Sequence, residues 1–171
     1  MTKEKTLRQC LTIAIAFIAS SLFTAASAND LVLEKYFAGH TRAEGQFSAI
    51  NGVKKSFKVR LTGRWNGKRL LLREDFTYAD GQKDRKTWQF VKTSPTTYLG
   101  TREDVVGRAF VRVNGDTARF SYDVYLDGNT RKNRVRFHDK MTLQSNGLLI
   151  NDAWVSKYGF PVARTHVEFR K

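Results

Sequence analysis

Two carboxylates stand at positions where an apolar side chain is expected. Every second residue of the run Leu70–Tyr78 is apolar except Glu74, and every second residue of Val135–Met141 is apolar except Asp139. A carboxylate among apolar side chains is unstable unless it is paired, hydrogen-bonded or protonated. Each acid therefore needs a partner, either on the protein or on a bound molecule.

Two interpretations of these acids are open. They line a cavity and contact a polar group of a ligand, or they form ion pairs with inward basic residues, for which Arg102, Lys86 and Lys157 are candidates. Structural ion pairs shift the pKa of a carboxylate as readily as binding sites do. A local β-bulge would turn either acid outward. A carboxylate-dependent glycoside hydrolase is a third reading, but no surrounding motif supports it, so we assign no catalytic residue.

The segments that carry the acids have the period of half-buried β-strands. Apolar and polar residues alternate over 56–65, 118–126 and 135–143, and weaker strands are readable at 45–50, 70–78, 85–91, 97–102, 108–113, 148–158 and 164–170. Six turn signals separate them: Asn51-Gly52, Asn66-Gly67, Asp80-Gly81, Asn114-Gly115, Asp127-Gly128 and Asn146-Gly147. Each pair is typical of a two-residue type I′ hairpin.

These elements predict an all-β protein with a single antiparallel meander barrel of about nine or ten strands, spanning residues 29–171. A short helix is expected over Leu31–Phe37, with Asp30 as its N-cap, at one end of the barrel. The chain shows no linker and no repeat of a conventional period.

A barrel of this size has room inside for one small ligand. We expect a wall that includes Trp88, Trp154 and Tyr158, with Glu74, Arg102 and Asp139 as polar contacts. The leading hypothesis is that a monomer binds a small apolar or amphipathic molecule, lipids included. No cofactor and no metal is expected, because His40, His138 and His166 have no metal-ligand spacing.

The first 28 residues have the pattern of a secretory signal peptide. Lys3, Lys5 and Arg8 precede an apolar run over 11–23, and Ala26-Ser27-Ala28 supplies the small residues that a signal peptidase reads. We expect cleavage after Ala28 and export to a bacterial periplasm or envelope. The single cysteine, Cys10, precedes the apolar run, so the protein is not expected to be a lipoprotein, and no disulfide is expected.

The chain carries 30 Lys and Arg against 16 Asp and Glu, a net charge of +14. Loss of three basic residues and Glu4 with the leader leaves +12. An exported protein rarely meets nucleic acid, so the alternative function is binding of anionic envelope lipids or polymers by a filled, inert barrel. Its contacts would be two basic strand faces: Lys58, Arg60 and Arg64, and Arg134, Arg136 and Lys140.

Several motifs resemble a bacterial envelope family known as domain of unknown function 3833. They are Leu33-Glu34-Lys35-Tyr36-Phe37-Ala38-Gly39, Gly63-Arg64-Trp65-Asn66-Gly67, Asp104-Val105-Val106-Gly107 and, the most specific, Ser156-Lys157-Tyr158-Gly159-Phe160. The resemblance implies an envelope location and a single domain, but no catalytic residue. A short helix before Gly45-Gln46-Phe47, with Arg170 on the last strand, is similar to lipocalins and other calycins, which implies ligand carriage.

Overall fold

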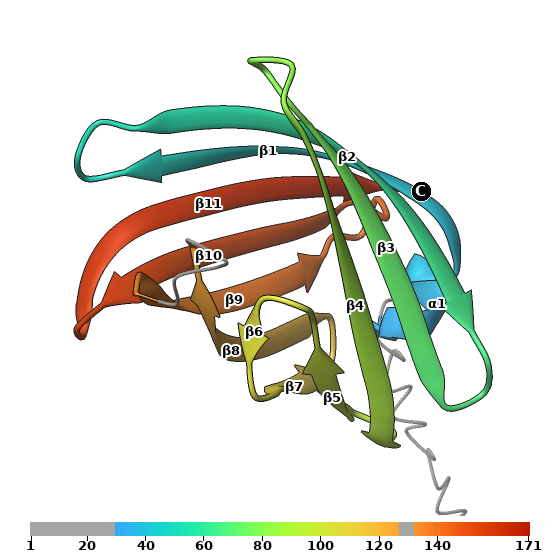
Figure 1. The fold of residues 1–171 in the computed structure, drawn as a ribbon. Coiled ribbons are helices and arrows are strands. Elements are labelled where there is room, and N and C mark those ends of the chain that lie inside the picture. Colours follow the sequence, from blue (N-terminus) through green and yellow to red (C-terminus); the bar gives the residue numbers. More distant parts are fainter. Residues whose placement is uncertain (1–29, 127–131) are drawn as a thin grey trace, which may run out of the picture.

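The computed structural model describes residues 30–126 and 132–171. The predicted signal peptide, residues 1–28, and the Asp127-Gly128 pair lie outside these ranges. Within them the chain forms one short helix, α1 (Leu33–Phe37), and eleven strands (Figure 1). The strands are β1 (Gly39–Ala49), β2 (Lys54–Trp65), β3 (Arg69–Tyr78), β4 (Lys83–Ser94), β5 (Thr97–Thr101), β6 (Val105–Val106), β7 (Ala109–Asn114), β8 (Thr117–Tyr125), β9 (Arg134–Leu143), β10 (Leu149–Lys157) and β11 (Phe160–Arg170).

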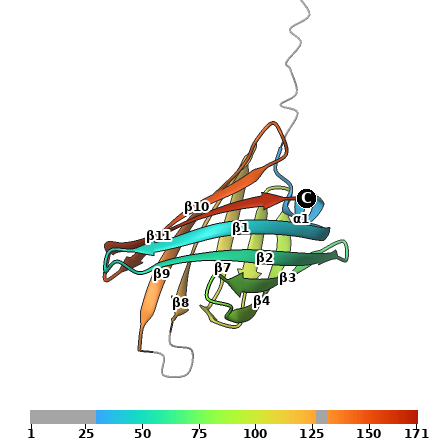
Figure 2. The same cartoon turned by 90° about the horizontal axis from the view of Figure 1, so that it is seen from above.

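The strands form one antiparallel sheet that closes on itself. Ten strands pair in the order β8-β7-β5-β4-β3-β2-β1-β11-β10-β9, and β9 pairs with β8 to complete the barrel. The two-residue strand β6 is an addition that pairs with β8 alone. The view from above in Figure 2 shows β1, β2, β10 and β11 along one wall. The predicted all-β antiparallel barrel is confirmed, with ten strands in the barrel and one extra.

Five of the six predicted turn pairs lie between consecutive strands, but they are not type I′ turns. That type needs a positive φ at both central residues, whereas here only the glycine of each pair has one, for example 87° at Gly52 and 84° at Gly81. The Asn or Asp stays in a common conformation, and in four of the five pairs its side chain accepts a backbone N–H two residues on, for example at 3.0 Å from Gln82 N to Asp80 Oδ1. These four loops are therefore longer turns built on Asx hydrogen bonds, whereas Asn114 pairs with Thr117 across the two-residue turn Gly115-Asp116.

Helix α1 packs against one end of the barrel. Leu33 and Phe37 are buried in the core, and the Leu31 amide donates to the carbonyl of Gly115 at 2.9 Å. The expectation that Asp30 caps the helix is wrong, because the helix begins later and Val32 occupies the N-cap position without a side-chain hydrogen bond.

A buried ion pair fixes the helix in place. The Glu34 carboxylate accepts from Lys92 Nζ on β4 at 2.5 Å and from the Tyr98 hydroxyl on β5 at 2.6 Å. Burial by itself would raise the pKa of Glu34, but these two hydrogen bonds, a backbone hydrogen bond and the Lys92 charge together outweigh it, and the pKa lies below its ordinary value. The pair joins the helix to the barrel wall.

Candidate ligand-binding cavity

The barrel encloses a cavity of about 610 Å³. Its wall is rich in aromatic and apolar side chains, which include Trp88, Phe90, Phe120, Tyr122, Phe137 and Met141. The rings pack on one another: Trp88 stacks on Phe90 and meets Tyr122 edge-on, both at 5.1 Å between ring centroids. These rings form a continuous apolar surface around the space.

The cavity runs from α1 toward the opposite end of the barrel. Leu33 and Phe37 line it at the helix end, whereas Lys55, Asp84 and Leu126 line it at the far end. The last three side chains are exposed to solvent, so the cavity opens at the end opposite the helix. A ligand would enter there.

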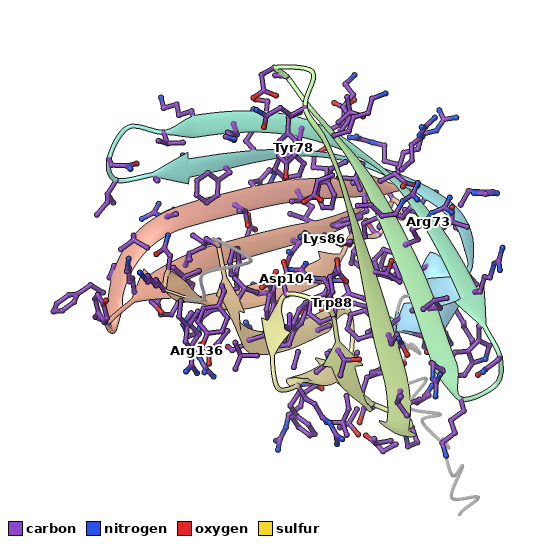
Figure 3. The ribbon with its side chains drawn as sticks, in the orientation of Figure 1. Arg73, Tyr78, Lys86, Trp88, Asp104 and Arg136 are labelled. Carbon is purple, nitrogen blue, oxygen red and sulfur yellow. The ribbon has the colours of Figure 1, made fainter. Side chains whose placement is uncertain are left out.

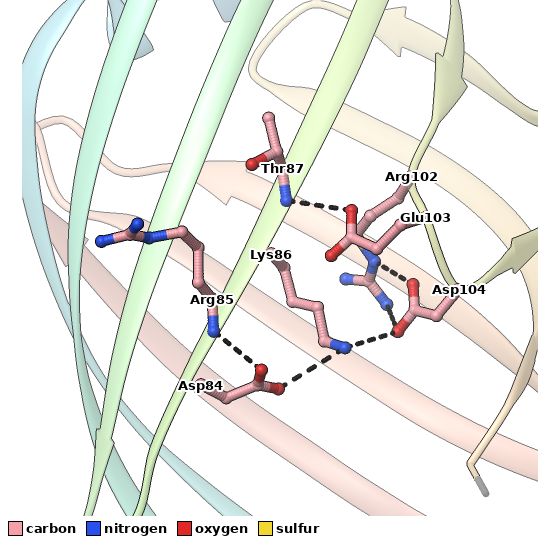
Figure 4. Close-up of polar contacts among 7 residues, drawn as sticks. All are labelled: Asp84, Arg85, Lys86, Thr87, Arg102, Glu103 and Asp104. Atoms are coloured by element: carbon pink, nitrogen blue, oxygen red, sulfur yellow. Dashed lines mark hydrogen bonds and ion pairs between the residues drawn. The ribbon is translucent and has the colours of Figure 1, made fainter. Parts of the chain in front are cut away.

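A polar cluster interrupts the apolar wall beside β4. The Arg102 guanidinium binds Asp104 through Nε at 2.6 Å and Nη2 at 3.2 Å, and Lys86 Nζ lies 3.3 Å from Asp104 and 3.5 Å from Asp84 (Figure 4). Arg102 also lies over the Trp88 ring, 4.7 Å from its centroid. Figure 3 shows Lys86, Trp88 and Asp104 toward the barrel interior and Arg73 and Arg136 outside it.

The placement of Arg102 follows from an interruption in strand pairing. Strand β5 pairs with β4 only over Gln89–Ser94, and the chain then leaves β5 and runs beside the first half of β4. A hydrogen bond from the Thr87 amide to Glu103, at 3.2 Å, and the Lys86–Asp104 pair hold this segment (Figure 4). Because the segment is not part of a strand, Arg102 turns inward, where its side chain is 12% exposed.

Glu74 lies on the inner face of β3 and is enclosed by the barrel wall. Lys86 is its direct neighbour on β4, but the Lys86 amine binds Asp84 and Asp104 instead. Burial raises the pKa of Glu74 to about 7, against the opposing effect of the Arg102 charge. Glu74 therefore changes its protonation state near neutral pH.

Asp139 lies across the cavity on β9 and is 7% exposed. Its Oδ1 accepts a hydrogen bond from Asn151 Nδ2 on β10 at 2.6 Å. Neither Asp139 Oδ2 nor Asn151 Oδ1 has a hydrogen-bond partner, although both atoms are buried. Burial raises the pKa of Asp139 to about 6, although the Asn151 hydrogen bond, the Arg102 charge and the Tyr122 hydroxyl lower it.

The structure brings four of the six predicted interior residues together: Glu74, Trp88, Arg102 and Asp139 all line the cavity. The interior placement of Trp154 and Tyr158 is wrong. Trp154 is 44% exposed and stacks on His138 outside the barrel, at 3.7 Å between ring centroids. Tyr158 is 88% exposed in the turn after β10. The alternation of β10 indicates that Trp154 points outward, because its neighbours Ala153 and Val155 take the inward positions.

The two acids do not form the ion pairs considered for them. Arg102 and Lys86 are inside but bind Asp104 and Asp84, and Lys157 donates to Asn133 instead. Within residues 30–126 and 132–171, no salt bridge joins a basic side chain to Glu74 or Asp139.

Sequence reasoning missed Asp104 and Asn151. The sequence does indicate an inward Asn151, because Asn151 alternates in phase with the inward residues Leu149 and Ala153 on β10. The sequence gives no such indication for Asp104, because it lies between strands.

The two basic strand faces are exposed, but they lie apart. Lys58, Arg60 and Arg64 are on β2 and Arg134, Arg136 and Lys140 on β9, and β1, β11 and β10 lie between these strands. Glu44 is 3.2 Å from Lys58, and Asp123 is 2.6 Å from Arg134. The barrel is hollow, so the filled interior of the alternative prediction is wrong.

Among residues 30–126 and 132–171, no three His, Cys, Asp or Glu side chains lie together in a way that would hold a metal ion. No helix in the same ranges has the length and hydropathy needed to cross a bilayer.

The fold and its hollow interior define a calycin-like barrel. It is similar to an S-type phycobiliprotein lyase, CPES, from Guillardia theta (TM-score 0.58, 9% identity, 82% of this chain and 93% of the other). It is also similar to Rv2717c from M. tuberculosis (TM-score 0.57, 13% identity, 80% and 92%). The chain belongs to the family described as Protein of unknown function (DUF3833), whose profile matches residues 14–171. No curated protein matches it.

Proposed function

We propose that this protein binds one small amphipathic molecule inside the barrel and is exported to the bacterial envelope to do so. The observation that carries the binding proposal is the cavity of about 610 Å³, in which an aromatic wall surrounds a few polar groups. Ligand sites are commonly hollows of about 300–1,000 Å³ with this composition. The apolar wall would hold the body of the ligand, and the polar cluster would orient its head.

Export rests on the N-terminal pattern described above, a basic stretch before an apolar run and Ala26-Ser27-Ala28. Fractionation of cells that produce the full chain would test it. Protein released with the periplasm and beginning at Asn29 supports the proposal, and protein that stays in the cytosol with residues 1–28 attached overturns it.

A side chain that fills the cavity should abolish ligand binding. Thr165 lines the cavity on β11, and its neighbour Arg164 points outward and is exposed. Thr165→Trp places an indole in the ligand space, and we expect at least about a tenfold loss of affinity for a fluorescent fatty-amine or fatty-alcohol probe, because the apolar body loses its contact area. Fluorescence titration and native mass spectrometry measure it.

The matched control is Arg164→Trp, which adds the same ring on the outer face. Equal binding by wild type and Arg164→Trp, with loss in Thr165→Trp, supports an interior site. Equal affinity in all three proteins, or wild-type protein that binds no probe and carries no small molecule from the cell, contradicts the proposal.

One observation favours a second function, contact with anionic lipid surfaces. Arg170, Arg42 and Arg60 are direct cross-strand neighbours on the outer face of β11, β1 and β2. Like charges directly opposite each other destabilise a sheet. Glu168 already binds Arg170 at 2.7 Å, so an anionic partner would relieve chiefly Arg42 and Arg60 in this row. The row extends to Asp75 and Arg85 on β3 and β4, which bind each other at 2.6 Å.

Neutralising this row should weaken binding to anionic vesicles. A basic residue near an anionic bilayer contributes about 1 kcal/mol, so the double variant Arg42→Gln/Arg60→Gln should bind vesicles that contain phosphatidylglycerol roughly ten- to thirtyfold more weakly. The control Arg134→Gln/Arg136→Gln removes the same charge from β9, where Asp123 already balances it. Vesicle co-sedimentation at low salt measures the difference. Equal losses in both double variants would indicate that net charge alone drives binding.

A further inference from the structure

The charged groups that face the cavity do not balance. Lys86 and Arg102 are satisfied by Asp84 and Asp104, and Lys55 lies at the mouth over the ring of Tyr78, 5.4 Å from its centroid. Glu74 and Asp139 form no salt bridge in the described part of the chain, and the charge of Arg102 acts on both only from a distance. The deep part of the cavity therefore has more acid than base.

The geometry at Asp139 and Asn151 shows which kind of group is missing. Asp139 Oδ2 and Asn151 Oδ1 are both hydrogen-bond acceptors, both are buried, and neither has a donor in hydrogen-bonding geometry, although the Tyr122 hydroxyl lies close enough to lower the pKa of Asp139. Rotating the Asn151 amide would remove its bond to Asp139 Oδ1, so a rotation satisfies neither residue. Buried acceptors are normally paired. What the site lacks is a donor.

The surroundings of this pair are aromatic. Tyr122 stacks on Phe137 at 5.4 Å between ring centroids and on Phe120 at 5.8 Å, and all three rings line the same cavity as Asp139. Aromatic faces attract cations, most strongly where water is excluded. Rings and carboxylates together favour a positively charged donor over a neutral one.

We propose that the ligand of this cavity is an amine, a protonated primary or secondary nitrogen on an apolar body, and that Asp139 and Asn151 accept its hydrogen bonds while Glu74 adds a second negative charge. The inference rests on the proposed function, because it names the head group of the molecule that the cavity binds. The amine nitrogen would occupy the space beside Asp139 Oδ2, and the apolar body would lie along the aromatic wall toward the mouth.

The binding of such an amine is coupled to pH. A cation stabilises the ionised form of a nearby carboxylate, so the complex needs Glu74 and Asp139 deprotonated. Both groups have a raised pKa in the empty protein, about 7 and about 6, so at pH 5 both are neutral and attract the amine weakly. The charges of Arg102, Lys86 and Lys55 oppose the amine, and those of Asp84, Asp104 and Glu103 favour it. Affinity should rise between pH 5 and pH 8.

Three probes of equal chain length test the head group: dodecylamine, dodecanol and dodecanoate, each titrated calorimetrically into the wild-type protein below its micellar concentration. We expect dodecylamine to bind at least about tenfold more tightly than dodecanol at pH 8 and dodecanoate to bind most weakly. The advantage of the amine should fall severalfold at pH 5.

The outcomes separate the two proposals. If the three probes bind equally, or if dodecanoate binds best, the amine inference is overturned while interior binding stands. If none of them binds, interior binding itself fails, and the inference fails with it.

Two amide variants locate the head group. Asp139→Asn keeps the shape of the side chain and removes its charge, and we expect it to reduce the amine advantage over the alcohol at least about fivefold. Asp152→Asn is the control, because Asp152 is exposed on the outer face of the next strand and binds His166. Glu74→Gln provides a second interior variant should Asp139→Asn fold poorly by near-UV circular dichroism. An unchanged amine advantage in a folded interior variant would contradict the assignment.

Discussion

Replacing Gly63 with alanine is expected to lower the free energy of unfolding by at least about 3 kcal/mol. A β-carbon at Gly63 on β2 would lie 1.9 Å from the carbonyl oxygen of Phe37 and 2.7 Å from its carbonyl carbon. Both atoms belong to the backbone at the end of α1, so no side-chain rotation relieves the overlap. Overpacking of this kind commonly costs about 1–3 kcal/mol, and more where backbone must move.

The same substitution should also open the closed end of the cavity. Moving α1 away from β2 displaces Leu33 and Phe37, which line the cavity, and strains the bond between Glu34 and Lys92. Urea unfolding measures the loss of stability, and binding of an environment-sensitive dye measures the exposed apolar surface.

Two control variants show whether the loss of stability in Gly63→Ala comes from the backbone overlap. A β-carbon at Gly45 would lie 2.5 Å from the ring of Phe57 and 3.0 Å from Cγ2 of Val167. Both are side-chain atoms that can move, so we expect a smaller loss of stability for Gly45→Ala. Arg64→Ala, on the exposed face next to Gly63, should change stability by less than about 0.5 kcal/mol. A Gly63→Ala protein as stable as the wild type would show that α1 does not pack against β2 as described.

The second large effect concerns pH: the empty protein should lose stability as the pH rises from about 4 to about 7. The native state holds a proton on Glu74 up to pH about 7 and on Asp139 up to pH about 6, whereas the unfolded chain releases them near 4.5 and 3.8. Between these limits the native state binds more protons than the unfolded state, so raising the pH favours unfolding. At 1.36 kcal/mol per pH unit, each acid contributes a loss of roughly 3 kcal/mol.

Amide variants isolate this contribution from the other titrating groups. Glu74→Gln mimics the protonated carboxyl at every pH, so it should match the wild type near pH 4.5 and exceed it by roughly 3 kcal/mol at pH 8. Denaturant unfolding across this range measures the difference between the two proteins. Glu44→Gln, at an exposed residue on β1, is the matched control, because it makes the same change outside the cavity. If the Glu74→Gln and wild-type profiles run parallel from pH 4.5 to pH 8, the carboxyl of Glu74 does not titrate in the cavity.

The wild-type profile should also respond to the ligand. Saturating dodecylamine stabilises the ionised acids, so it should reduce the loss of stability between pH 5 and pH 8. A smaller loss of stability in the presence of dodecylamine would link the buried acids to the amine by a measurement independent of affinity.

The residues themselves determined the strands, the inward acids and the positions of the turns. Alternation with a period of two is a property of neighbouring residues, so it places Glu74 with Leu72 and Phe76, and Asp139 with Phe137, without knowledge of the partner strand. The aromatic character of Trp154 favours the interior, but its position between the inward Ala153 and Val155 places it outside. The turn type was wrong because the Asx hydrogen bond, not a positive φ at Asn or Asp, forms these loops.

Only the tertiary structure decided what each polar group meets. Arg102 faces the cavity because the pairing of β4 with β5 ends early and the chain turns inward, and no local pattern encodes the length of a strand pairing. Asn151 reaches Asp139 because β10 lies beside β9 in a particular register, and Asp104 takes both basic side chains away from Glu74. These are contacts between residues distant in the chain, so they depend on how the barrel closes. That closure leaves the two acids enclosed and without a basic partner.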